Sequence, residues 1–165
     1  MHRMATVSTP AAAADPHDVL GYLLKHANQR LAALTDAALA PLGIDGKDFG
    51  ALRVLAGGEP TSQLQVAQRL GVDRTTMVAL LDALERKGIV ARRPDPADRR
   101  RNIVELTEQG HETFARARVE HAGAEGRFLA AIDPDAAAQL RRTLRALVER
   151  AEPGTPPGPG PAPRG

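Results

Sequence analysis

Apolar residues recur at helical spacing along the first third of the chain. Asp15 can cap a helix and Pro16 suits the first helical position, after which leucine and alanine return every three or four residues. The stripe comprises Leu20, Leu23, Leu24, Ala27, Leu31, Leu34 and Ala38. Pro41 and Gly43 follow it, so the pattern predicts one long first helix that ends there.

A shorter second helix is expected after Asp45, which is placed to cap it. Phe49, Leu52 and Ala56 fall on one side of this segment. The pair Gly57 and Gly58 then stops the helix.

Two amphipathic segments separated by the turn "GVD" come next. Ser62 and Gln65 have capping-box spacing, Gly71 suits the left-handed residue that closes a helix, and Asp73 can cap the following one. The expected inner faces are Leu64, Ala67 and Leu70 in the first segment and Met77, Leu80, Leu81 and Leu84 in the second. The pattern therefore predicts a helix, a tight turn and a helix.

Gly88 ends that helix, and two β-prone runs follow, "IVARR" at 89–93 and "NIVEL" at 102–106. A β-hairpin is the simplest interpretation of two such runs around a short loop. Thr107 can then cap a helix that runs toward Ile132.

A last helix is predicted from Asp133 as cap and Pro134 at the first position. Its apolar stripe is Leu140, Leu144, Leu147 and Val148. The expected fold is mainly α with a small β-hairpin, in the order α-α-α-α-β-β-α-α.

Composition narrows the class of protein. A chain of 165 residues suits one domain, and with only 2% aromatic residues its core must be built from aliphatic side chains, as in helix-on-helix packing.

The small or Pro/Gly-rich ends, 1–14 and 152–165, are expected to be disordered. Without cysteine, disulfides and thiolate metal sites are excluded. No signal peptide or long apolar run is evident, so a cytoplasmic location is expected.

Positive charge is concentrated in one part of the chain. The formal net charge is only +2, yet the pI is about 9.5 and much of the excess of cations lies between Arg86 and Arg101. A local cluster of this kind attracts a polyanion.

The helix after Asp73 has an outer face suited to the DNA major groove. Opposite its apolar stripe lie Thr75, Ala79, Asp82 and Arg86, with Thr76 and Ala83 beside them. Threonine can hydrogen-bond bases or phosphates, and alanine can lie against a thymine methyl group. The alternative is that this is simply the polar face of any surface helix.

The hairpin turn is crowded with arginine in "RRPDPADRRRN", residues 92–102. Guanidinium groups at a hairpin tip fit a narrow minor groove, where the negative potential is focused. Alternatively, the arginines pair with Asp95 and Asp98 in a solvated turn.

The stretch "DRRRNIVELTEQG", directly after a helix-turn-helix, resembles the wing signature of the MarR (multiple antibiotic resistance regulator) family of winged helix-turn-helix transcription factors. The matching positions are Asp98, Arg100, Leu106, Thr107 and Gly110. The resemblance spans about 15–151. It implies a sequence-specific transcriptional regulator, expected to be a ligand-responsive repressor, that reads double-stranded DNA as a homodimer.

The resemblance also implies roles for individual residues. Arg100 would enter the minor groove and Asp98 would orient the wing arginines, while the helix after Asp73 would be the recognition helix. Position 79 departs from the family, since many relatives have a polar or basic residue there. The candidate DNA contacts are Arg74, Thr75, Thr76, Ala79 and Arg86 in the helix, Asp98, Arg99, Arg100 and Arg101 in the wing, and Thr61, Ser62 and Gln63 for the DNA backbone.

A dimer is expected because the terminal helices carry more apolar surface than a small winged helix can cover. The expected organisation is a dimerisation helix at 15–44, a winged helix-turn-helix at 45–106 and dimerisation helices at 107–151. Two recognition helices would then read a pseudo-palindromic site.

Tyr22, His26 and Arg30 lie at i, i+4 and i+8 on the first helix. Relatives in the family respond to small aromatic or phenolic effectors, and these three side chains suit a carboxylate or phenolate. The alternative is an exposed or interface-lining polar strip.

Other functions find little support in the residues. The sequence shows no nucleophile beside a base, no cluster of metal ligands and no phosphate-cradling loop. We therefore expect no enzymatic activity, no metal site and no cofactor. The competing interpretation is a winged-helix protein-interaction or RNA-binding module without sequence-specific DNA readout.

Overall fold

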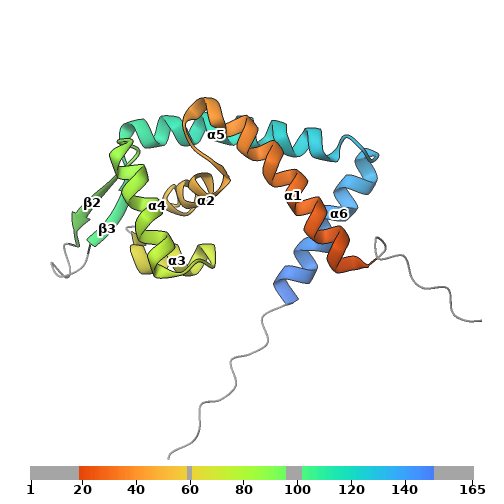
Figure 1. The fold of residues 1–165 in the computed structure, drawn as a ribbon, viewed down its shortest axis with the longest axis horizontal. Helices are drawn as coiled ribbons and strands as arrows, with labels where there is room; N and C mark the ends of the chain where they lie inside the picture. Colours follow the sequence, from red (N-terminus) through yellow and green to blue (C-terminus); the bar gives the residue numbers. More distant parts are fainter. Residues whose placement is uncertain (1–18, 59–60, 96–101, 151–165) are drawn as a thin grey trace, which may run out of the picture. The chain divides into compact units, whose positions relative to one another are not determined.

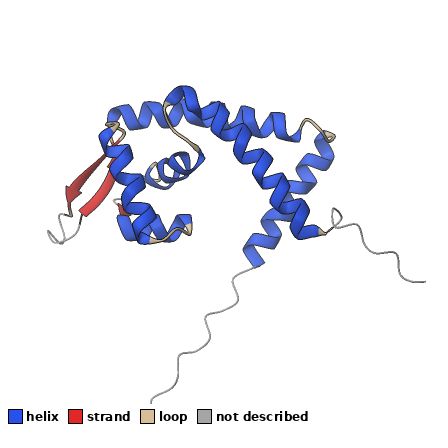
Figure 2. Ribbon diagram, in the orientation of Figure 1, coloured by secondary structure: helices blue, strands red, loops and turns tan. Residues whose placement is uncertain are grey.

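The computed structural model describes residues 19–58, 61–95 and 102–150. Helices dominate these residues, and the strands are confined to one small sheet (Figures 1 and 2). The helices are α1 (Leu20–Leu39), the 3₁₀ helix η2 (Ala40–Leu42), α2 (Gly46–Leu55), α3 (Gln63–Leu70), α4 (Arg74–Arg86), α5 (Glu108–Leu129) and α6 (Pro134–Arg150). The strands are β1 (Thr61–Ser62), β2 (Val90–Pro94) and β3 (Asn102–Leu106).

The chain divides into two compact units, residues 1–128 and 129–165. The first contains the hydrophobic core, built where α2, α3, α4 and the sheet meet, with Leu39 at the end of α1 and Ala117 of α5 also buried in it. Its largest fully buried side chains are Leu39, Leu52, Met77, Leu81, Leu84, Val66, Val90 and Val104. The second unit is dominated by α6.

The predicted hairpin is confirmed. β2 and β3 pair antiparallel, from Val90 opposite Leu106 to Pro94 opposite Asn102. A third strand was not predicted: β1 pairs antiparallel with the other side of β3, with Thr61 opposite Val104. The observed order therefore has a short strand between α2 and α3. The same two residues pair with β3 and, through Ser62, cap α3.

The predicted caps of the central helices are confirmed. Asp45 accepts hydrogen bonds from the amides of Lys47 and Asp48, and Asp73 accepts one from the Thr76 amide. Gly71 closes α3 with φ of 66°, a left-handed conformation that glycine adopts without steric cost.

Two helix boundaries differ from the predictions. α1 begins at Leu20, after an extended Val19, whereas the expected cap Asp15 and first turn at Pro16 lie outside the described residues. α5 ends at Leu129, short of Ile132.

One residue of the predicted inner face of α3 is not buried. Val66 and Ala67 are buried, while Leu64 is 55% exposed. The cause is the short helix, in which the side chain nearest the cap lies beyond the edge of the core that α2 and α4 supply.

Candidate nucleic-acid interface

The two helices of the helix-turn-helix, α3 and α4, each begin at hydrogen bonds that the sequence specifies. The Ser62 hydroxyl accepts from the Gln65 amide, and the Gln65 side chain accepts in return from the Ser62 amide at 2.8 Å. At the start of α4 the Thr76 hydroxyl donates to Asp73 at 2.6 Å. This bond and that from the Thr76 amide lower the pKa of Asp73 below its ordinary value of 3.8.

The outer face of α4 is open to solvent. The predicted contacts Arg74, Thr75, Thr76, Ala79 and Arg86 are all exposed, and the opposite face carries the buried Met77, Leu81 and Leu84. Because the Thr76 hydroxyl already donates to Asp73, it is left as an acceptor. Arg74 and Thr75 are therefore the exposed side-chain donors in the first turn of this helix.

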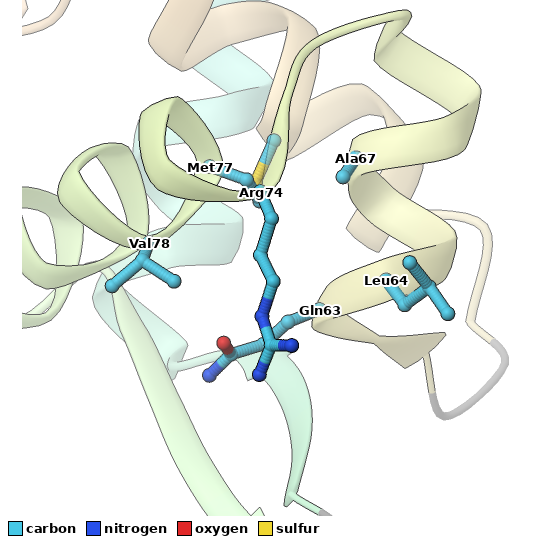
Figure 3. A pocket seen from close by; sticks show the side chains of 6 residues that line it. All are labelled: Gln63, Leu64, Ala67, Arg74, Met77 and Val78. Atoms are coloured by element: carbon cyan, nitrogen blue, oxygen red, sulfur yellow. The ribbon is translucent and has the colours of Figure 1, made fainter.

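Arg74 also borders a cavity of about 200 Å³ between α3 and α4 (Figure 3). In Figure 3 its side chain leaves α4 and extends beside the Gln63 carboxamide of α3, with the exposed Leu64 at the rim. The arrangement joins two predicted positions, Gln63 and Arg74, into one polar edge on the helix-turn-helix.

The three positions predicted to contact the DNA backbone have different environments. Gln63 is partly exposed, and Ser62 is engaged in the cap of α3. Thr61 is 3% exposed within β1. Contact between Thr61 and the DNA backbone stays a prediction, and Gln63 is more accessible to solvent than Thr61.

The first two arginines of the predicted wing bind within the domain. Arg92 on β2 pairs with Asp82 and Glu85 of α4, and Arg93 pairs with Glu105 of β3 at 2.6 Å. Both arginines therefore have partners on neighbouring elements. The wing tip, with Asp98, Arg99, Arg100 and Arg101, lies outside the described residues.

The end of the hairpin is locked to α4 and α5 by the "LTEQG" part of the signature. The Thr107 hydroxyl donates to the Gly88 carbonyl at 2.6 Å and accepts from the Gly110 amide at 2.9 Å, confirming the predicted cap. A Cβ at Gly110 would overlap the Ile89 carbonyl oxygen. These two signature residues are therefore structural.

An aromatic and cationic cluster that the sequence interpretation missed lies between α2 and α5. The rings of Phe114 and His121 stack on Phe49, with centroid distances of 5.9 and 4.7 Å. The guanidinium carbons of Arg53 and Arg118 lie 6.0 Å from the Phe49 and Phe114 ring centroids. The cavity they border has a volume of about 320 Å³. Its sequence signal is phenylalanine followed by arginine four residues later, repeated on two helices.

The predicted effector residues lie elsewhere, on α1. The rings of Tyr22 and His26 are 4.0 Å apart by centroid, and Arg30 is exposed. The lining of the cavity comes from α2 and α5 and includes none of these three.

Among the described residues, no cluster of three or more His, Asp or Glu side chains is placed to hold a metal ion. Within the same ranges no helix is long and apolar enough to span a membrane.

A helix-turn-helix joined directly to an antiparallel hairpin, with an exposed polar face on its second helix, defines a winged helix-turn-helix protein. The model of the MarR family matches residues 42–101. The HTH-type transcriptional repressor NicR of Pseudomonas putida is 34% identical over 113 residues, which are 65% of this chain and 72% of NicR. The repressor Rv2887 of Mycobacterium tuberculosis is 31% identical over 128 residues, 78% of this chain and 92% of its own.

Solved structures of MarR-family proteins have the same fold. The repressor CouR, bound to a 23-mer DNA duplex, matches with a TM-score of 0.77 and 31% identity, covering 85% of this chain and 99% of CouR. The chain therefore belongs to the MarR family and is a DNA-binding transcriptional regulator.

Proposed function

We propose that this protein is a homodimeric, ligand-responsive repressor that reads a pseudo-palindromic operator. The observation that carries the proposal is the exposed face of α4 held beside a hairpin whose loop contains three consecutive arginines. α4 would enter the major groove and the wing the adjacent minor groove. Arg74, Thr75, Ala79 and Arg86 are the proposed contacts of the helix, with Thr76 as an acceptor, and Asp98 orients Arg99, Arg100 and Arg101 in the wing.

The exposed apolar side chains support a dimer. On α1, Leu20, Leu23 and Leu24 are 67%, 50% and 46% exposed. On α6, considered by itself, Leu140, Leu144, Leu147 and Val148 are also exposed. Leaving such stripes in water favours association, so we assign 15–44 and 107–151 to dimerisation and 45–106 to DNA binding. The half-sites would then lie about one helical turn, or roughly 10 bp, apart.

The DNA-binding proposal is tested by selecting duplexes from a randomised pool and measuring the affinity of the recovered sequence by fluorescence anisotropy. Arg74→Ala and Arg100→Ala should each weaken binding, whereas Arg116→Ala, an exposed position on α5, should not. With about 6 to 10 phosphate contacts, affinity should fall roughly 10³- to 10⁵-fold between about 50 and 200 mM salt. A protein that recovers no preferred sequence, or Arg100→Ala binding as tightly as the parent, contradicts the proposal.

We further propose that the effector is a small aromatic anion. CouR of Rhodococcus jostii has been solved with p-coumaroyl-CoA and PcaV of Streptomyces coelicolor with its natural ligand. In this chain the cavity of α2 and α5 offers stacked rings for an aromatic body and two guanidinium groups for its charge. Tyr22, His26 and Arg30 remain the alternative site.

Calorimetry with salicylate distinguishes the two sites. Arg53→Gln/Arg118→Gln should abolish binding if the cavity of α2 and α5 is used, and Tyr22→Ala/His26→Ala should do so if α1 is used. Arg116→Gln is the matched control, because it removes a cation from α5 outside the cavity lining. Binding that survives in both double variants contradicts both sites.

A further inference from the structure

We propose that Arg92 promotes DNA binding without contacting DNA, by neutralising two carboxylates on the recognition helix. Asp82 and Glu85 both belong to α4, and Arg92 reaches them from the neighbouring strand β2. The inference rests on the proposed function, because it requires α4 to face a duplex.

The geometry fixes the Arg92 side chain on α4. Its Nη2 lies 2.5 Å from Asp82 Oδ1, and its Nη1 pairs with Glu85 Oε2. The side chain is 17% exposed, and its Nε is buried without a hydrogen-bond partner among the described residues. Both terminal nitrogens are thus engaged with the helix, and the guanidinium group is largely covered.

The two carboxylates need this neutralisation. Their side chains are 45% and 41% exposed, and Asp82 lies on the side of α4 opposite the buried Met77, Leu81 and Leu84. Exposed charges act over about 8 Å at physiological salt, so an uncompensated carboxylate on that face repels phosphate. The planar fork of arginine presents one terminal nitrogen to each acid in a fixed geometry, whereas lysine would offer a single compact ammonium on a flexible stem.

A direct phosphate contact by Arg92 is the alternative. Such a contact would have to break one of its two ion pairs and expose a carboxylate at the same surface. The two mechanisms differ in what happens when the acids are removed together with the arginine. Neutralisation becomes unnecessary, whereas a lost phosphate contact stays lost.

The test uses four full-length proteins and the duplex recovered from the randomised pool with the parent. They are the parent, Arg92→Gln, Asp82→Asn/Glu85→Gln, and the triple variant that combines all three changes. Anisotropy titrations across a salt series give the affinity and its salt dependence for each, and circular dichroism with thermal unfolding checks that each is folded.

We expect Arg92→Gln to weaken binding about ten- to a hundredfold, because it leaves both carboxylates uncompensated. The triple variant should regain most of the parent's affinity and lie within about threefold of Asp82→Asn/Glu85→Gln. Its salt dependence should equal the parent's, because the number of phosphate contacts is unchanged.

Two results would overturn the inference. One is an Arg92→Gln protein that binds like the parent. The other is a triple variant that stays far weaker than Asp82→Asn/Glu85→Gln, with a salt slope reduced by about 0.9 for each lost contact. The second comparison holds even if Arg92→Gln alone fails to fold. A parent that ignores duplex DNA would instead refute the proposed function.

Discussion

Gly110 is placed where the end of the hairpin meets the first turn of α5. A Cβ there would overlap the backbone carbonyl of Ile89, which cannot move without disturbing the bond from the Thr107 amide to the same oxygen. Gly110→Ala should therefore lower the free energy of unfolding by about 1 to 3 kcal/mol, as overpacking does.

Gly126, later in the same helix, is the matched control. An added Cβ there meets nothing within 4 Å, so Gly126→Ala should raise the free energy of unfolding by up to about 1 kcal/mol through helix propensity. Urea unfolding of both variants measures the difference. Equal effects at the two glycines would show that contact with Ile89 is not the cause.

Asp73 should make the stability of the folded protein depend on pH. Its pKa is lowered in the folded protein, chiefly by the Thr76 hydroxyl, so its ionised form favours folding. That contribution is fully present above the unfolded pKa, near 4, and is lost as pH falls through the lower folded pKa. Asn at this position can still cap α4 but does not titrate.

The melting temperatures of the parent and Asp73→Asn should therefore differ by a constant amount above about pH 5 and converge in stronger acid. Thermal unfolding followed by circular dichroism from neutral pH to about pH 2 measures this difference. A difference that does not change with pH would mean that the carboxylate of Asp73 contributes nothing as a charge.

Between elements, the start of α2 is tied to the end of α4 by one ion pair. Lys87 Nζ lies 3.1 Å from Asp48 Oδ2, and the Asp48 side chain is 11% exposed. Asp48 directly precedes Phe49 of the aromatic cluster, so the pair connects the candidate effector cavity to the proposed recognition helix. We propose that occupancy of one site biases the other through this pair.

Lys87→Met should lower the free energy of unfolding by about 1 kcal/mol or more, because it leaves a largely buried carboxylate without its cation. It should also reduce the effect of salicylate on DNA affinity. Lys47→Met removes an exposed lysine from α2 and serves as control. Chemical unfolding and anisotropy with and without salicylate provide both measurements, and a response equal in the two variants would exclude the link.

The elements predictable from sequence were those set by neighbouring residues. Ser62 with Gln65, Asp73 and Gly71 each act within one helical turn, so the helix-turn-helix was predicted correctly. β1 was missed because Thr61 gains its strand conformation only from pairing with Val104, which is distant in sequence. The partners of Arg92 and the cluster around Phe49 likewise depend on packing between elements, which local spacing does not specify.

For the whole molecule, the feature that bears most on assembly is the exposed apolar stripe of α6, Leu140, Leu144, Leu147 and Val148. Leu144 lies near its centre and is 39% exposed, so in a two-fold dimer we expect it to be buried against the second copy. A glutamate there would have to be desolvated in the interface, which costs several kcal/mol unless the charge finds a partner.

Leu144→Glu should therefore convert the dimer to monomer and abolish tight binding to the selected duplex, since one protomer holds only one half-site. Ala138→Glu adds the same charge to the opposite, polar side of α6 and should leave both properties unchanged. Light scattering after size-exclusion chromatography gives the mass, and anisotropy gives the affinity. If Leu144→Glu stays dimeric with parental affinity, the protomers must associate through another surface, and the exposed leucines of α1 become the next positions to test.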